Sequence, residues 1–123
     1  MNVMLWIVQV VLALAFLAHG VFLVFPPASM VEQINASLPR WFQLFIGVAE
    51  VAAAVGLTLP ALTRIQPRLV PMAAGGIMIV MVSATIFHIG RSEWSSAATT
   101  VVLLVMATWV AYMRWRVRPI SPR

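Results

Sequence analysis

Apolar residues along the chain fall into four long stretches, and the charged residues gather between and after them. The stretches run over about residues 3–25, 41–59, 69–89 and 96–113. An α-helix of about 20 residues rises about 30 Å, which matches the hydrocarbon core of a bilayer. Because the connections between the later stretches are short, consecutive helices are expected to be antiparallel neighbours. The pattern therefore predicts an all-α integral membrane protein with four transmembrane helices in an antiparallel bundle.

Prolines and polar residues predict where these elements begin and end. Pro60 is predicted to stop the second transmembrane helix, because proline removes a backbone donor and clashes with the preceding turn. The longest connection, residues 26–40, is predicted to contain a short helix from about Met30 to Ala36. Ser29 and Glu32 have the spacing of a capping box at its start. Such a helix would lie at the membrane interface between the first and second spans.

The composition favours lipid as the solvent of this chain. Of the 123 residues, 63% are AVILMFWYC and 9% are charged, whereas about 25% of an average soluble domain is charged. A soluble domain this small could not bury so much apolar surface. The length predicts one domain over residues 1–123. The chain has no cysteine, which excludes disulfides and thiolate chemistry.

The arginines predict the orientation in the membrane. All eight positive side chains are arginine, and they lie between and after the apolar stretches, which is not the pattern of a nucleic-acid groove. Four crossings would place six of them on the side of both termini: Arg64, Arg68, Arg114, Arg116, Arg118 and Arg123. By the positive-inside rule, both termini are predicted to be cytoplasmic. We therefore expect a multi-pass protein of the bacterial cytoplasmic (inner) membrane.

Four polar side chains are predicted to lie in the outer half of the membrane: His19, Gln43, Glu50 and His88. Gln43 and Glu50 are seven residues apart, so both point the same way from their helix. A charged carboxylate near mid-membrane is costly, so Glu50 is expected to be neutral, hydrated or paired with a histidine. We therefore predict that the four groups converge on one cavity that opens outward.

The chemistry of these residues leaves several interpretations open. Glu50 with His19 or His88 could act as a catalytic acid–base pair, and the same residues with Gln43 could bind a ligand. Alternatively, they only tie helices together through hydrogen bonds. Two histidines on separate helices could also ligate haem, but we favour this less, and the sequence contains no metal-binding motif.

Small residues predict where the helices pack closely. Ala49, Ala52, Ala53 and Gly56 have small-x-x-x-small spacing along the second predicted helix. A second group, residues 73–76, crowds the third helix. In membranes, such residues let helix backbones approach each other. Both groups are therefore predicted to lie at helix–helix contacts.

Several segments together carry a family resemblance. Residues 47–60, GVAEVAAAVGLTLP, have Glu50 within a G-x-x-E…G-L-x-x-P pattern, and residues 16–20 are FLAHG. Residues 71–75, PMAAG, are followed by His88 with an arginine and a glutamate. In order and spacing the chain resembles the DoxX-like family of small four-helix membrane proteins. Many members have a lysine three positions after the first-helix glycine, where this chain has Leu23.

The resemblance implies a four-helix membrane bundle and a link to redox pathways that involve quinones or sulfur compounds. Our first hypothesis is a small protein that binds an apolar ligand such as a quinone, as an accessory subunit or partner of an oxidoreductase. The alternative is an intramembrane acid–base enzyme, an isomerase, cyclase or epoxide-opening catalyst, that acts on a lipophilic substrate. A third hypothesis is a scaffold without a ligand. The lipid bilayer is the expected environment, and a homodimer is compatible with so small a bundle.

Overall fold

A computed structural model describes residues 2–122, and its elements confirm the all-α membrane fold. Four helices are long and apolar enough to cross a membrane. They are α1 (Asn2–Val24), α3 (Arg40–Thr63), α4 (Leu69–Gly90) and α5 (Trp94–Tyr112), which continues into a π-helical turn, η2 (Met113–Val117). Between α1 and α3 lie a 3₁₀ turn, η1 (Ala28–Met30), and the short helix α2 (Val31–Ser37). The predicted connecting helix is thereby confirmed.

One predicted helix end and one predicted helix cap are wrong. Helix α3 does not stop at Pro60 but continues through it to Thr63. Membrane helices tolerate an internal proline when neighbouring groups satisfy the freed backbone, and Pro60 is buried in the bundle. The capping box is also absent, because Met30 is the N-cap of α2 and no side chain caps this helix.

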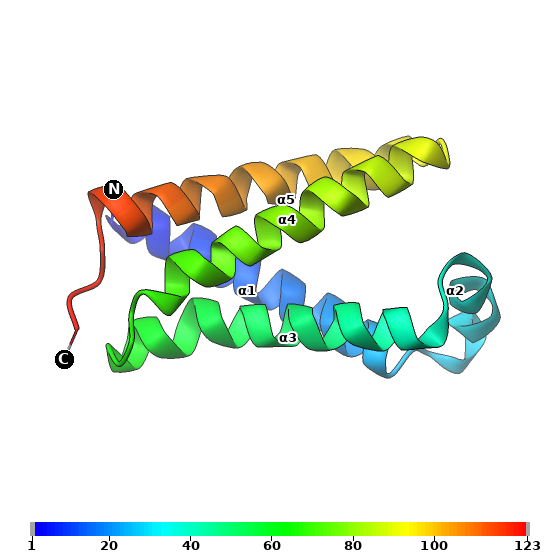
Figure 1. The fold of residues 1–123 in the computed structure, drawn as a ribbon, viewed down its shortest axis with the longest axis horizontal. Coiled ribbons are helices and arrows are strands. Elements are labelled where there is room, and N and C mark those ends of the chain that lie inside the picture. Colours follow the sequence, from blue (N-terminus) through cyan, green and yellow to red (C-terminus); the bar gives the residue numbers. More distant parts are fainter. Residues whose placement is uncertain (1, 123) are drawn as a thin grey trace.

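The four spans form two antiparallel pairs, α1 with α3 and α4 with α5 (Figure 1). Contacts of α3 with α4 and of α1 with α5 join the pairs into one bundle. Figure 1 shows the pairs close together where both termini and the α3–α4 loop lie. Towards α2 and the α4–α5 turn the pairs diverge.

The buried core follows this shape. It is shared by all four spans near the end that holds the termini, with Leu12, Leu57, Ile77 and Val110 among its members. All buried residues of α4 lie between Val70 and Met81. Beyond that point α4 is tied to α5, for example by a 2.7 Å hydrogen bond between the hydroxyls of Thr85 and Thr100. The outer parts of the two pairs are therefore packed within each pair.

The charged residues divide between the two ends of the bundle. We call the end with both termini and the α3–α4 loop the arginine end; its described arginines are Arg64, Arg68, Arg114, Arg116 and Arg118. The opposite end carries α2, the α4–α5 turn, Arg40 and Arg91. The positive-inside rule places the arginine end in the cytoplasm, and this orientation remains a prediction.

Candidate functional site

Two glycines bring α1 and α3 into backbone contact. A Cβ atom on Gly20 would lie 2.7 Å from the carbonyl oxygen of Gly47, and one on Gly47 would lie 2.9 Å from that of Gly20. Cβ contacts under 3.0 Å essentially never occur, so any side chain here would push the helices apart. His19 precedes Gly20, and Glu50 lies about one turn after Gly47. The glycine contact therefore sets how close these two polar residues come.

His19 and Glu50 form a hydrogen-bonded pair inside the membrane-spanning region. Nδ1 of His19 lies 2.7 Å from Oε1 of Glu50. The Glu50 side chain is only 4% exposed, whereas that of His19 is 56% exposed. The imidazole also stacks on Phe22, with 6.2 Å between ring centroids. A buried carboxyl group is thus linked to the protein surface through an accessible imidazole.

Gln43 has a different set of partners. Its amide nitrogen donates to Oδ1 of Asn35 and to the carbonyl oxygen of Leu38, both at 2.8 Å. Its Oε1 accepts a 3.2 Å hydrogen bond from Arg40. Gln43 is fully buried in this network. These bonds hold the segment around α2 against the first turn of α3.

Arg40 also caps the C-terminal end of α1. Nη1 of Arg40 donates to the carbonyl oxygen of Leu23 at 2.8 Å, and Nη2 donates to that of Val24 at 2.6 Å. The last carbonyls of a helix carry partial negative charge, which a guanidinium stabilises. Arg40 thus ties the C-terminal end of α1 to the first turn of α3.

His88 pairs with Glu93 at the α4–α5 turn. Nδ1 of His88 lies 2.8 Å from Oε1 of Glu93, and Nε of Arg91 lies 3.5 Å from the same oxygen. The four polar residues predicted to converge are thus distributed over three hydrogen-bonded groups. The structure brings His19 and Glu50 together and gives Gln43 and His88 partners of their own.

The His88–Glu93 pair predicts a dependence of stability on acid. The hydrogen bond from His88, aided by the charge of Arg91, lowers the pKa of the Glu93 carboxyl below its ordinary value. A lowered pKa in the folded state contributes stability above the pKa of the unfolded chain, about 4.3 for glutamate. We expect this contribution to disappear as the pH falls through 4.3 and then through the lower folded-state pKa. Melting temperatures of the wild type and Glu93→Gln should differ at pH 6 and converge in acid; a constant difference would contradict this.

A cavity of about 390 Å³ lies beside the Gln43 group, where α1 meets the connecting segment. Its lining residues are Val24, Phe25, Pro26, Val31, Asn35 and Arg40. Neither Glu50 nor His19 lines it. The buried carboxyl group therefore lies outside this cavity. Within residues 2–122, no group of three or more His, Cys, Asp or Glu side chains could hold a metal ion.

The positive-inside pattern predicts for Arg114 only a role in membrane orientation. In the structure its side chain is buried, and its Nε donates a 2.9 Å hydrogen bond to Oε1 of Gln9. Gln9 in turn donates to the carbonyl oxygen of Leu57 at 2.5 Å. The spacing from Val110 to Arg114, one helical turn, was the available signal that this arginine shares the core face.

The fold and the buried polar groups define a four-helix protein of the lipid bilayer. The family model of the DoxX-like family matches residues 7–110, so the chain belongs to this family. No curated protein and no solved structure matches the chain.

Proposed function

We propose that this protein binds an apolar small molecule such as a quinone at the His19–Glu50 pair. The observation that carries the proposal is the 2.7 Å hydrogen bond between a buried carboxyl and a half-exposed imidazole within the spans. Since Glu50 occupies Nδ1, the imidazole has Nε2 left on its other edge to hydrogen-bond a ligand carbonyl. Membrane-soluble ring compounds that carry a carbonyl oxygen suit such a surface, because Phe22 stacks beside the imidazole and offers the ring an aromatic neighbour.

The proposed role is that of an accessory subunit or partner of a redox system. A carboxyl–imidazole pair holds a proton within the membrane. A bound quinone could accept a hydrogen bond from this pair and remain in the membrane. Native extraction followed by mass spectrometry tests the role. Recovery of an oxidoreductase subunit with the chain would support it, and recovery of the chain alone would contradict it.

The binding proposal is tested with purified protein in detergent and a prenylated quinone, read out by quenching of tryptophan fluorescence. We expect His19→Phe and Glu50→Gln to weaken binding about tenfold, the value of a buried polar contact of about 1.4 kcal/mol. His88→Phe and Glu93→Gln are the matched controls, since this pair is separate from His19. Equal affinities in all five proteins would reject binding at this pair, and no binding in any of them would favour a scaffold without a ligand.

The same hydrogen bond supports a second candidate function, intramembrane acid–base catalysis. Glu50 would fix the orientation of His19, and the imidazole would transfer the proton to or from a lipophilic substrate. The expected evidence is turnover of a candidate isomerisable or epoxide-bearing lipid that is lost in His19→Phe and kept in His88→Phe. Binding of the lipid without conversion would reject catalysis while leaving the binding proposal intact.

A further inference from the structure

The arginine end contains a buried guanidinium that is held only by neutral groups. Arg114 is 4% exposed. Nε donates to Gln9, and Nη1 donates to the carbonyl oxygen of Arg118 at 3.1 Å. The ring of Trp6 lies 5.1 Å from its Cζ atom in a cation–π contact. Because arginine stays charged under all ordinary conditions, this group keeps a full positive charge in a poorly hydrated place.

The acidic side chains of the chain do not neutralise this charge. The sequence has three acidic residues in all. Glu50 and Glu93 are paired with His19 and His88. Glu32 lies in α2, at the opposite end of the bundle (Figure 1). Buried charges in proteins are usually paired with an opposite charge, and these carboxylates lie elsewhere.

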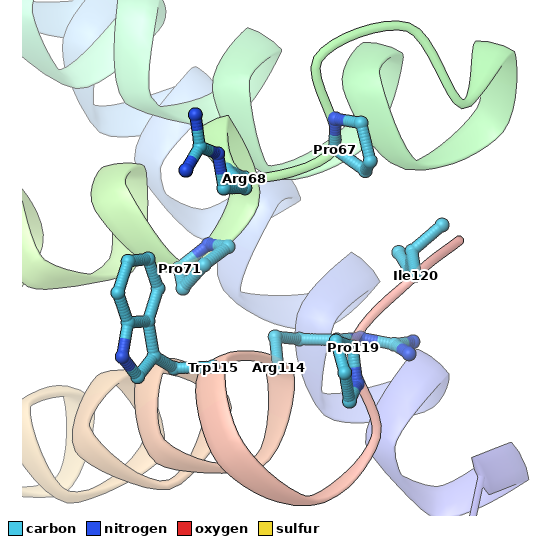
Figure 2. Close-up of a pocket in the computed structure, with 7 residues that line it drawn as sticks. All are labelled: Pro67, Arg68, Pro71, Arg114, Trp115, Pro119 and Ile120. Atoms are coloured by element: carbon cyan, nitrogen blue, oxygen red, sulfur yellow. The ribbon is translucent and has the colours of Figure 1, made fainter. Parts of the chain in front are cut away.

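One nitrogen of Arg114 has unused donor capacity. Within residues 2–122, Nη2 is the buried side-chain polar atom that lacks a hydrogen-bond partner. Arg114 also lines a cavity of about 200 Å³ between the start of α4 and the end of the chain. Figure 2 shows its lining residues, which are Pro67, Arg68, Pro71, Arg114, Trp115, Pro119 and Ile120. Arg114 and the exposed Arg68 thus both line a cavity whose other walls are proline, tryptophan and isoleucine, and their guanidinium groups point in different directions (Figure 2).

The local backbone is built around this arginine. Arg114 lies in the π-helical turn η2, which the Arg118 amide closes by donating to the carbonyl oxygen of Met113 at 2.6 Å. The chain then folds back, and the carbonyl oxygen of Ser121 accepts a 2.9 Å hydrogen bond from Nε of Arg64. Ile120 packs against the core at the same place. Such π-helical turns occur often at functional sites, and this one forms one wall of the cavity.

We propose that this cavity binds a phosphate group, with Arg114 as its buried donor and the exposed side chain of Arg68 turning towards the ligand as the second donor. Phosphate oxygens accept paired hydrogen bonds from guanidinium groups, and two arginines match the charge of a phosphate better than that of a single carboxylate. The cavity lies at the end of the spans, at the depth of lipid headgroups, and its apolar walls suit an attached acyl chain. The phosphate belongs either to an anionic phospholipid or to a soluble phosphate compound, and the experiment separates these sources.

The test uses the full chain, delipidated in detergent and studied by native mass spectrometry. Phosphatidylglycerol, inorganic phosphate and oleate serve as probes. We expect Arg114→Gln to weaken binding of the phosphate-bearing probe about tenfold, the loss of one charge-assisted contact. Arg116→Gln is the matched control, because it removes the same charge from an exposed position in the same turn. Arg68→Gln, at an exposed position of the cavity wall, should also weaken binding and is not expected to impair folding.

Each outcome decides a part of the proposal. Binding of phosphatidylglycerol but not inorganic phosphate identifies a lipid headgroup, and competition by inorganic phosphate identifies a soluble ligand. An equal loss in Arg114→Gln and Arg116→Gln would overturn the site, because only general attraction to the net charge would remain. Binding of oleate alone would overturn the assignment to phosphate. If Arg114→Gln does not fold, unchanged binding in Arg68→Gln is the result that refutes the proposal.

Discussion

Gly20→Ala is expected to destabilise the folded protein by about 2 kcal/mol, within the range typical of overpacked cores. The added methyl group would meet two atoms of α3 at once, the carbonyl oxygen of Gly47 at 2.7 Å and a methyl carbon of Val51 at 2.8 Å. The carbonyl belongs to the backbone, so no rotamer change can relieve the contact and α1 must move away from α3. The midpoint of thermal unfolding in detergent measures the loss.

The same movement should separate His19 from Glu50, because the glycine contact lies beside this pair. Gly20→Ala is therefore expected to weaken ligand binding as well as stability. Gly76→Ala provides the matched control, since no atom lies within 4 Å of a Cβ atom there. Alanine is a better helix former than glycine by up to about 1 kcal/mol, so the control should be neutral or slightly more stable. Equal unfolding midpoints for the two variants would contradict the close packing of α1 on α3.

Hydrophobic length predicted the four spans well because lipid imposes one simple requirement. Each span needs about 20 apolar residues, and nothing in the packing can shorten that requirement. The predicted end of α3 at Pro60, however, was wrong. A proline ends many helices in water, but α3 continues for three more residues to Thr63 while its side of the bundle covers Pro60. Local propensity was overridden by tertiary packing.

The packing prediction from small residues was right only in part. A Cβ atom on Gly56 would lie 2.9 Å from that of Ala73, so these two residues do lie at the α3–α4 contact. Gly75 and Gly76, however, have no atom within 4 Å of a Cβ position. The closest approach instead joins Gly20 and Gly47. Small-residue spacing identifies faces that can pack closely, but it does not say which two helices use them.

The depth of each polar residue in the membrane, estimated from its position along its helix, determines how much of the candidate site could be predicted. His19 and Glu50 lie at compatible depths and on helices that pair, and the structure joins them. His88 lies beyond Met81, where α4 no longer contributes buried residues, and its partner is Glu93. Depth alone carries no information about this lateral divergence of the helix pairs. The sequence could therefore propose the members of the polar group but not divide them correctly.

Arg114 shows a further limit of reading charges by position. An arginine that follows an apolar stretch satisfies the positive-inside rule whether it is exposed or buried. The rule gave the same account of Arg114 and Arg116, although the first is buried and the second is exposed. What distinguishes them is first the helix face, since Arg114 lies one turn after the buried Val110, and then the fold-back of the last residues, which depends on long-range contacts such as the one from Arg64 to Ser121.

His19→Leu is expected to cost about 2 kcal/mol of stability, because it leaves the Glu50 carboxyl buried without its hydrogen-bond partner. Glu50→Leu should be close to neutral or even stabilising. It removes the polar group from the membrane interior and leaves only a half-exposed imidazole without its partner. The double variant should have the same stability as Glu50→Leu, because without the buried carboxyl group the histidine no longer serves as its hydrogen-bond partner. A double-mutant cycle on unfolding free energies in detergent measures this coupling.

The His88–Glu93 pair is the internal control for this cycle. It joins the same two residue types at nearly the same distance, 2.8 Å, but its glutamate side chain is 40% exposed, compared with 4% for Glu50. Water can replace either partner there, so His88→Leu and Glu93→Leu should show a weaker coupling than His19→Leu and Glu50→Leu. The difference in destabilisation between His19→Leu and His88→Leu thus measures the effect of burying the glutamate rather than the strength of the hydrogen bond itself. If His19→Leu were as mild as His88→Leu, Glu50 would be hydrated in the membrane, and the proposed link from a buried carboxyl to the surface would be wrong.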